Sequence, residues 1–176
     1  MKKIVFLFAV LCFLISGCTS EIASSDDTMP AYSGTGIIAR AATIEKDTKS
    51  TEVERIVFTG NDMLWFNETT KEIRFKDNSS LKTAIANVQA LKFYIDTEFL
   101  FTSYVLQSSS NTQTINSLVF VYNTTENKYY LLDGYPPVTN DLALAANEAR
   151  DKNNQSIVTE WSLFINQLKK EGKYTK

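Results

Sequence analysis

The stretch that decides the fold runs from Ser117 to Leu132 and reads Ser-Leu-Val-Phe-Val-Tyr, Asn-Thr-Thr-Glu-Asn, Lys-Tyr-Tyr-Leu-Leu. Two runs rich in aromatic and branched aliphatic residues flank five residues of turn composition. This pattern predicts a β-hairpin with strands at Ser117–Tyr122 and Lys128–Leu132. Because side chains alternate along a strand, Tyr129 and Tyr130 are expected to lie on opposite faces of the sheet.

Similar runs toward the N-terminus predict further strands. Short polar segments separate them, which favours antiparallel pairing between neighbours along the chain. The predicted strands are Val53–Thr59, then a hairpin of Met63–Phe66 with Glu72–Lys76, and then a pair formed by Leu91–Ile95 and Phe99–Leu106.

Helical spacing appears in two regions. Asn78 or Ser79 is a suitable N-cap for a short helix that reaches Val88. Near the C-terminus, Thr139 or Asn140 can cap a helical run in which Leu142, Ala145, Ala146 and Ala149 share a face. After a polar patch at residues 150–156, apolar residues recur at helical spacing and form one stripe that ends before Gly172. The residues of this stripe are Ile157, Trp161, Phe164, Ile165 and Leu168.

The C-terminal stripe must be covered, either by a membrane surface or by the sheet. Lysines occur only at the end of this helix, and therefore packing on the sheet is the favoured interpretation. Together these patterns predict an α+β domain with an antiparallel sheet of about five to seven strands. A short helix follows the first hairpin, and a long C-terminal amphipathic helix packs on one face of the sheet.

The first residues have the features of an export signal. Lys2 and Lys3 precede an apolar run, Ile4–Ile15, and Gly17 stands directly before Cys18. This arrangement resembles a bacterial lipoprotein signal, which implies removal of residues 1–17 and acylation of Cys18. The run has only 12 residues, fewer than the roughly 20 that a membrane-spanning helix needs. We therefore expect an anchor made of acyl chains.

After the predicted signal, the amino-acid composition separates a polar segment from a longer segment that can form a domain. Residues 18–50 are polar and rich in serine, which favours a flexible tether after the acylated cysteine. The alternative for part of this segment is a first strand at Gly36–Ala42. Residues 51–176 are expected to form one α+β domain, of a size that can bury a substantial core.

The charge and the missing residue types exclude several classes of function. The formal net charge is −2, and the tightest basic cluster, at Lys169, Lys170 and Lys173, suits a helix end. No nucleic-acid partner is therefore expected, and the protein is expected to be a monomer. There is no histidine, and Cys12 leaves with the signal, so catalytic triads, thiol chemistry and the usual zinc sites are not expected. Neither a metal nor a cofactor is predicted.

Carboxylate chemistry is the main catalytic alternative, since glycoside hydrolysis requires two carboxylates across a cleft. The candidates by residue type lie mostly in predicted turns, where Asp and Glu also serve the backbone. No catalytic residue is therefore predicted. These candidates are Asp62, Glu68, Glu72, Asp96, Glu98 and Asp133.

Aromatic side chains are the other resource for binding, because exposed Tyr and Trp form strong contacts with partners. Tyr135 lies in a loop beside Pro136 and Pro137, and it is the best single candidate for a ligand-binding residue. Core packing is the simpler interpretation for the others. The full set is Trp65, Phe66, Tyr94, Tyr104, Tyr122, Tyr129, Tyr130 and Tyr135.

Three segments carry a resemblance to a known group: Asn67–Phe75, Lys128–Pro136 and the closing helix at Glu160–Leu168. Over residues 53–172 the chain resembles small lipoproteins of unknown function from Bacteroidetes. The resemblance implies an envelope protein anchored in the outer membrane, on its periplasmic or its outer side, without assigned catalysis. It transfers no functional residue.

The expected function is that of a non-catalytic envelope module that binds a protein or a glycan. One alternative is a periplasmic inhibitor or immunity-like protein, which would use a protruding loop at Gln107–Asn116 or Gly134–Val138. The other alternative is a carboxylate-dependent hydrolase of glycan or peptidoglycan.

Overall fold

The computed structural model describes residues 35–42, 55–107, 114–137 and 144–176. All described residues belong to one compact unit, residues 31–176. The predicted signal, Cys18 and most of the predicted tether lie outside the described residues. In the described ranges, no helix has both the length and the apolar character that crossing a membrane requires.

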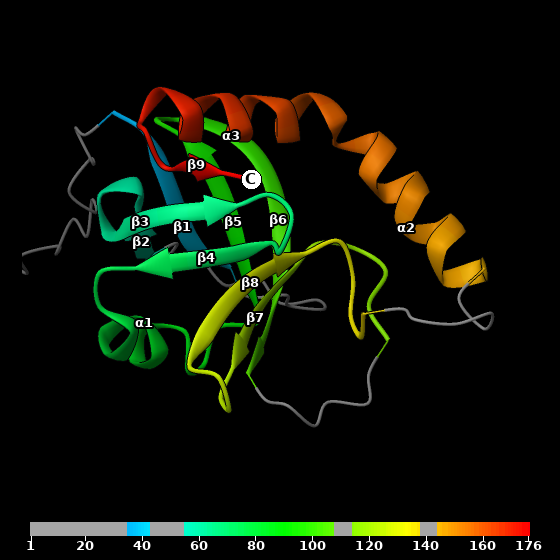
Figure 1. Cartoon of the computed structure of the whole chain (residues 1–176), viewed down its shortest axis with the longest axis horizontal. Helices are drawn as coiled ribbons and strands as arrows, with labels where there is room; N and C mark the ends of the chain where they lie inside the picture. Colours follow the sequence, from blue (N-terminus) through cyan, green and yellow to red (C-terminus); the bar gives the residue numbers. More distant parts are fainter. Residues whose placement is uncertain (1–34, 43–54, 108–113, 138–143) are drawn as a thin grey trace, which may run out of the picture. The chain divides into compact units, whose positions relative to one another are not determined.

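A single mixed sheet of nine strands forms the domain (Figure 1). Across the sheet the order is β2-β1-β5-β6-β7-β8-β4-β3-β9. The strands are β1 (Ile37–Ala42), β2 (Ile56–Thr59), β3 (Met63–Asn67), β4 (Glu72–Phe75), β5 (Ala90–Ile95), β6 (Glu98–Gln107), β7 (Val119–Asn123), β8 (Lys128–Leu132) and β9 (Tyr174–Thr175).

The sheet is curled into a half-barrel. Phe58 on β2 and Phe75 on β4 have ring centroids only 4.9 Å apart, although five strands lie between β2 and β4 in the sheet order. Such a contact requires the sheet to bend until its distant strands face each other. The concave side is therefore an enclosed interior.

The three predicted hairpins are confirmed: β3 pairs with β4, β5 with β6, and β7 with β8, all antiparallel. The expectation of five to seven strands, all antiparallel, is wrong. β6 and β7 are parallel, and so are β3 and β9. The segment between β6 and β7 has the length that a parallel crossover needs, about a dozen residues, and β9 reaches β3 only after the C-terminal helices.

β1 lies inside residues 18–50, so the tether prediction is wrong for residues 37–42. The alternative of a strand at Gly36–Ala42 is confirmed, because β1 pairs with β2 on one side and β5 on the other. Ile37, Ile38 and Ala39 are all buried. The first three residues of β1 are apolar without alternation, and Arg40 follows them, which is a weak strand signal in so short a segment.

The short helix α1 (Asn78–Ala84) follows the first hairpin, as predicted. Its N-cap is Asp77, one residue earlier than expected, and the Asp77 carboxylate accepts hydrogen bonds from the backbone N–H groups of Ser79 and Ser80. A single 3-10 turn, η1 (Gly60–Asp62), joins β2 to β3.

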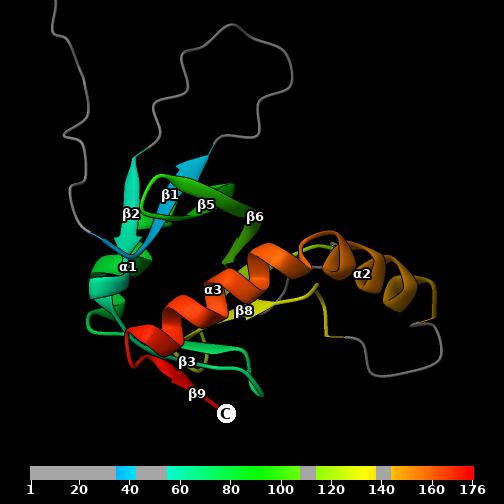
Figure 2. The ribbon, with the colours of Figure 1, turned by 90° about the horizontal axis from the view of Figure 1, so that it is seen from above.

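Two helices, not one, close the chain: α2 (Leu144–Ser156) and α3 (Val158–Lys170). Packing on the sheet is confirmed for α3, whose Phe164, Ile165 and Leu168 enter the main core. Most α2 side chains are exposed, and Figures 1 and 2 show this helix extending past the sheet from the start of α3. The predicted long helix is therefore broken at Ile157.

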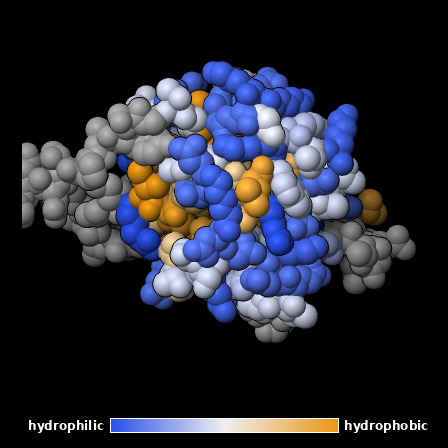
Figure 3. Space-filling view, turned by 60° about the vertical axis from the view of Figure 1, so that its left-hand side comes forward, coloured by the Kyte–Doolittle hydropathy of each residue, from blue (hydrophilic) through white to orange (hydrophobic). Residues whose placement is uncertain are grey.

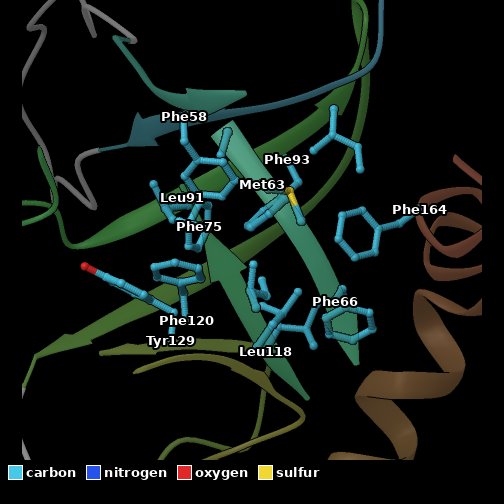
Figure 4. Packing of buried hydrophobic residues seen from close by; sticks show 14 of the residues in the cluster. Phe58, Met63, Phe66, Phe75, Leu91, Phe93, Leu118, Phe120, Tyr129 and Phe164 are labelled. Carbon is cyan, nitrogen blue, oxygen red and sulfur yellow. The ribbon is translucent and has the colours of Figure 1, made fainter. Parts of the chain in front are cut away.

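Aromatic rings fill the concave interior (Figure 4). Phe120 stacks on Tyr129 with centroids 5.6 Å apart, and Phe93 meets Phe164 of α3 at 5.9 Å. Tyr129 is fully buried there, whereas Tyr130 packs against a second cluster, so their placement on opposite faces is confirmed. The concave interior is therefore occupied by side chains.

Candidate functional site

A hollow of about 240 Å³ lies where α2 meets α3, next to the β3–β4 turn and the ends of β7 and β8. Its walls combine aliphatic side chains, one aromatic ring, one amide and two opposite charges. The lining residues are Lys71, Leu118, Asp133, Asn154, Ile157, Val158 and Trp161.

The break between the helices shapes this hollow. Ile157 leaves helical geometry, with φ −120° and ψ 15°, and α3 begins there without a side-chain cap. The backbone stays connected across the break, since the Ile157 N–H donates to the Asn154 carbonyl (3.3 Å) and the Trp161 N–H to the Ile157 carbonyl (2.8 Å). The break therefore brings side chains of both helices to one opening.

Lys71 enters the hollow from the β3–β4 turn. The Asn67 side chain accepts hydrogen bonds from the N–H and hydroxyl of Thr70, and Lys71 then takes the left-handed conformation with φ 60°. Its ammonium lies 5.3 Å from the centroid of the Trp161 ring, a cation–π contact of about 0.5–1 kcal/mol at an exposed site. Among the described residues the ammonium has neither an ion-pair nor a hydrogen-bond partner.

Trp161 is half-buried and packs into the core from its inner side. Its ring centroid lies 5.8 Å from that of Phe101, 5.5 Å from that of Phe164 and 6.0 Å from that of Phe66. With Lys71 over the ring as well, little of either face is left for stacking. Trp161 therefore serves mainly as a wall of the hollow.

Asp133 follows β8 and is half-buried. Its carboxylate has no ion-pair or hydrogen-bond partner in the part of the chain that the structure describes. The nearby Arg150 guanidinium instead donates from Nη2 to the Pro136 carbonyl (2.9 Å) and from Nε to Asn116 Oδ1 (3.4 Å). Burial lowers the pKa of Arg150, and the charge of Asp133 partly opposes this shift.

Gly134 is required where Arg150 crosses the chain. A Cβ at this position would lie 2.2 Å from Arg150 Nε, and therefore any other residue would displace the guanidinium. Arg150 is only 8% exposed. These contacts hold α2 against the segment after β8, and they keep the wall formed by Asp133 in place.

Tyr135, the ligand-binding residue suggested by the sequence, does not line the hollow. It is half-buried against the second cluster, beside Ile115. The two residues exchange backbone N–H···O hydrogen bonds of 2.8 Å in both directions. The described part of the Gly134–Val138 loop is thus held against the domain.

The other candidate aromatics divide by burial. Phe66, Tyr122 and Tyr129 are buried, while Trp65, Tyr94 and Tyr130 are partly buried. Tyr104 is 41% exposed on β6, away from the hollow's lining. None of this set lines the hollow; its aromatic residue, Trp161, belongs to the apolar stripe predicted for the C-terminal helix.

The candidate carboxylates are dispersed, and most have local structural partners. Asp96 accepts the Gly36 N–H at 2.6 Å, Glu72 pairs with Lys128 at 3.2 Å, and Glu68 accepts the hydroxyl of Tyr174. Glu98 is exposed at the start of β6. Only Asp133 of the predicted set lines the hollow described above.

A second hollow of about 210 Å³ lies between β2 and α1 and includes two carboxylates, Asp62 and Asp77. Asp62 accepts hydrogen bonds from the N–H and hydroxyl of Thr59. The Ser80 hydroxyl and the Ser80 and Ser79 N–H groups lower the pKa of Asp77. A general acid needs a raised pKa, so this arrangement suits capping and not acid catalysis.

Within the described ranges, no group of three or more Asp, Glu, Cys or His side chains is placed to hold a metal ion. Cys18, the predicted site of lipid attachment, lies outside these ranges. No family model matches the chain, and no curated protein or solved structure is significantly similar to it. The candidate site therefore rests on geometry alone.

Sequence reasoning found Asp133 but missed Lys71, Asn154 and Trp161 as members of one site. Lys71 and Trp161 are ninety positions apart, and nothing local links them. The sequence offers one local signal, the position of Lys71 at the end of a predicted turn. The left-handed backbone conformation occurs at such positions.

Proposed function

We propose that the protein is an envelope lipoprotein, anchored in the outer membrane through acylated Cys18. The support comes from the sequence: a basic start, a short apolar run and Gly17 before Cys18. The acyl chains would hold the mature protein on the membrane without a spanning segment.

The domain on this anchor is, in our proposal, a non-catalytic binding module that uses the hollow between α2 and α3. One observation carries the proposal: Lys71 and Asp133 present opposite charges to the same hollow and have no ion-pair partner among the described residues. Both side chains are partly shielded from solvent, which strengthens their attraction to a ligand group of opposite charge. A ligand that satisfies them would account for their arrangement.

A small ligand is favoured over a large protein partner. Figure 3 shows one face of the domain, on which apolar areas lie among hydrophilic ones. The hollow itself is below the roughly 300–1,000 Å³ of pockets that enclose drug-sized molecules.

The two alternative functions have less support. An inhibitor needs a protruding loop, but residues 134–137 are held by Arg150 and Ile115, and residues 108–113 lie outside the described ranges. A hydrolase needs an acid and a base, but Asp62 and Asp77 are engaged in capping hydrogen bonds.

Blocking the hollow should abolish binding without unfolding the domain. Val158 is 60% exposed on the rim, so Val158→Trp adds bulk at the opening at little cost to the core. Thr159→Trp is the matched control, because Thr159 is exposed and does not line the hollow. The measurement is the shift in Tm of the full chain with a panel of amino acids, dipeptides, monosaccharides and organic acids.

A compound that raises the Tm of the wild type and of the Thr159→Trp variant by several degrees, but not that of Val158→Trp, is the expected result. A panel that leaves the wild-type Tm unchanged would argue against a small-molecule module. Equal shifts in all three proteins would place the binding site elsewhere.

A further inference from the structure

Resting on the proposed function, we infer that the ligand of the hollow is a small zwitterion, a free α-amino acid with an aliphatic side chain. Its carboxylate would meet the Lys71 ammonium, and its ammonium would meet the Asp133 carboxylate. The apolar wall formed by Leu118, Ile157 and Val158 would receive the side chain.

The two protein charges carry this inference. Lys71 and Asp133 line one hollow, yet they form no salt bridge with each other. The charge of Asp133 also acts on Arg150, but the hydrogen bonds of that guanidinium go to Pro136 and Asn116. Each charge is therefore available to a ligand group of opposite sign, in a site where partial burial strengthens the attraction.

The charges on the two sides of the hollow set the orientation of the ligand. Lys71 enters from the β3–β4 turn, and Asp133 follows β8. An anionic group is therefore favoured near Lys71, and a cationic group is favoured near Asp133.

The Asn154 side-chain amide and the volume of the hollow also suit a free amino acid. The Asn154 side chain can both donate and accept a hydrogen bond, which suits a molecule with both kinds of polar group. A hollow of about 240 Å³ has room for a free amino acid.

A sugar fits the site less well. Sugar rings bind by stacking on an exposed aromatic face, and the Trp161 ring already has the Lys71 ammonium 5.3 Å from its centroid. Phe101 and Phe164 pack against it from the core. A glycan ligand would have to displace the lysine before it could stack.

The test uses isothermal titration of the full chain with L-leucine and two analogues that each lack one charge. 3-Methylbutylamine retains the ammonium, and 4-methylpentanoate retains the carboxylate. L-Alanyl-L-alanine and glucose are the competing probes. The variants are Lys71→Met and Asp133→Asn, with Lys152→Met, an exposed position on α2, as the matched control.

The expected result is that L-leucine binds and that each analogue binds about 10- to 100-fold more weakly, which is the usual effect of losing a charged hydrogen bond. Lys71→Met should weaken L-leucine and 4-methylpentanoate but not the amine. Asp133→Asn should weaken L-leucine and the amine but not the acid. Lys152→Met should change none of these affinities.

Analogues that bind as tightly as L-leucine would overturn the inference, and so would stronger binding of glucose or of the dipeptide. If Val158→Trp abolished that other binding, the proposed function would stand with a different ligand. Absence of L-leucine binding would also overturn the inference, while the wider panel with Val158→Trp and Thr159→Trp decides the proposed function independently.

Discussion

Replacing Phe164 by alanine should lower the free energy of unfolding by about 3–5 kcal/mol, the usual cost of removing a fully buried phenylalanine ring. The Phe164 side chain has no exposed surface, and its centroid lies 5.5 Å from that of Phe101 and 5.9 Å from that of Phe93. Figure 4 shows it pointing from α3 into the interior. Urea unfolding followed by circular dichroism measures the difference.

The matched control is Leu163→Ala, one position earlier on α3. Leu163 is 39% exposed, and its removal should change the free energy of unfolding by less than about 1 kcal/mol. Similar losses of unfolding free energy for the two variants would contradict the packing of α3 described above, because that packing buries Phe164 and leaves Leu163 partly exposed.

Replacing Cys18 by alanine should move the protein from the membrane fraction to the soluble fraction almost completely. Acyl chains stabilise membrane binding by about 0.8 kcal/mol for each buried methylene, and the variant has no thiol to carry them. Cell fractionation followed by immunoblotting measures the distribution between the two fractions.

Cys12→Ala provides the control for this experiment, since Cys12 lies within the apolar run of the predicted signal. That variant should remain on the membrane. If the Cys18→Ala variant stayed there too, the anchor would have to come from another part of the chain, and the lipoprotein interpretation would be wrong.

The parts of the fold that sequence predicts well are those held by local signals. The hairpin β7–β8 has two runs rich in aromatic and branched aliphatic residues on either side of a polar turn, and α3 has a stripe at helical spacing. The two strands of the hairpin are neighbours in sequence, so closing the loop between them costs little conformational entropy.

Pairings between distant segments had no such signal. β1 joins the sheet between β2 and β5, and β9 pairs with β3 across more than a hundred residues. These strands are short, with six and two residues, so periodicity does not reveal their neighbours. The break at Ile157 was equally hidden, because an apolar residue there fits the helical stripe.

In the candidate site, too, local sequence features identified some residues but not the contacts between distant segments. Asp133 was identified by residue type, but its association with Lys71 and Trp161 depends on how the sheet curls and where the helix breaks. Tyr135 was selected for its loop position, and a pair of backbone hydrogen bonds to Ile115 holds it in place. Residue type suggests candidates, and tertiary packing decides which of them share a site.

The most direct test of the central claim, that the hollow between α2 and α3 is a binding site, is NMR mapping. Backbone amide shifts of the ¹⁵N-labelled full chain are recorded during a titration with L-leucine. We predict saturable shifts confined to Lys71, Asp133 and residues 154–161. Shifts confined to the β2–α1 hollow would contradict it, whereas a complete absence of shifts would overturn the inference that the ligand is an aliphatic amino acid.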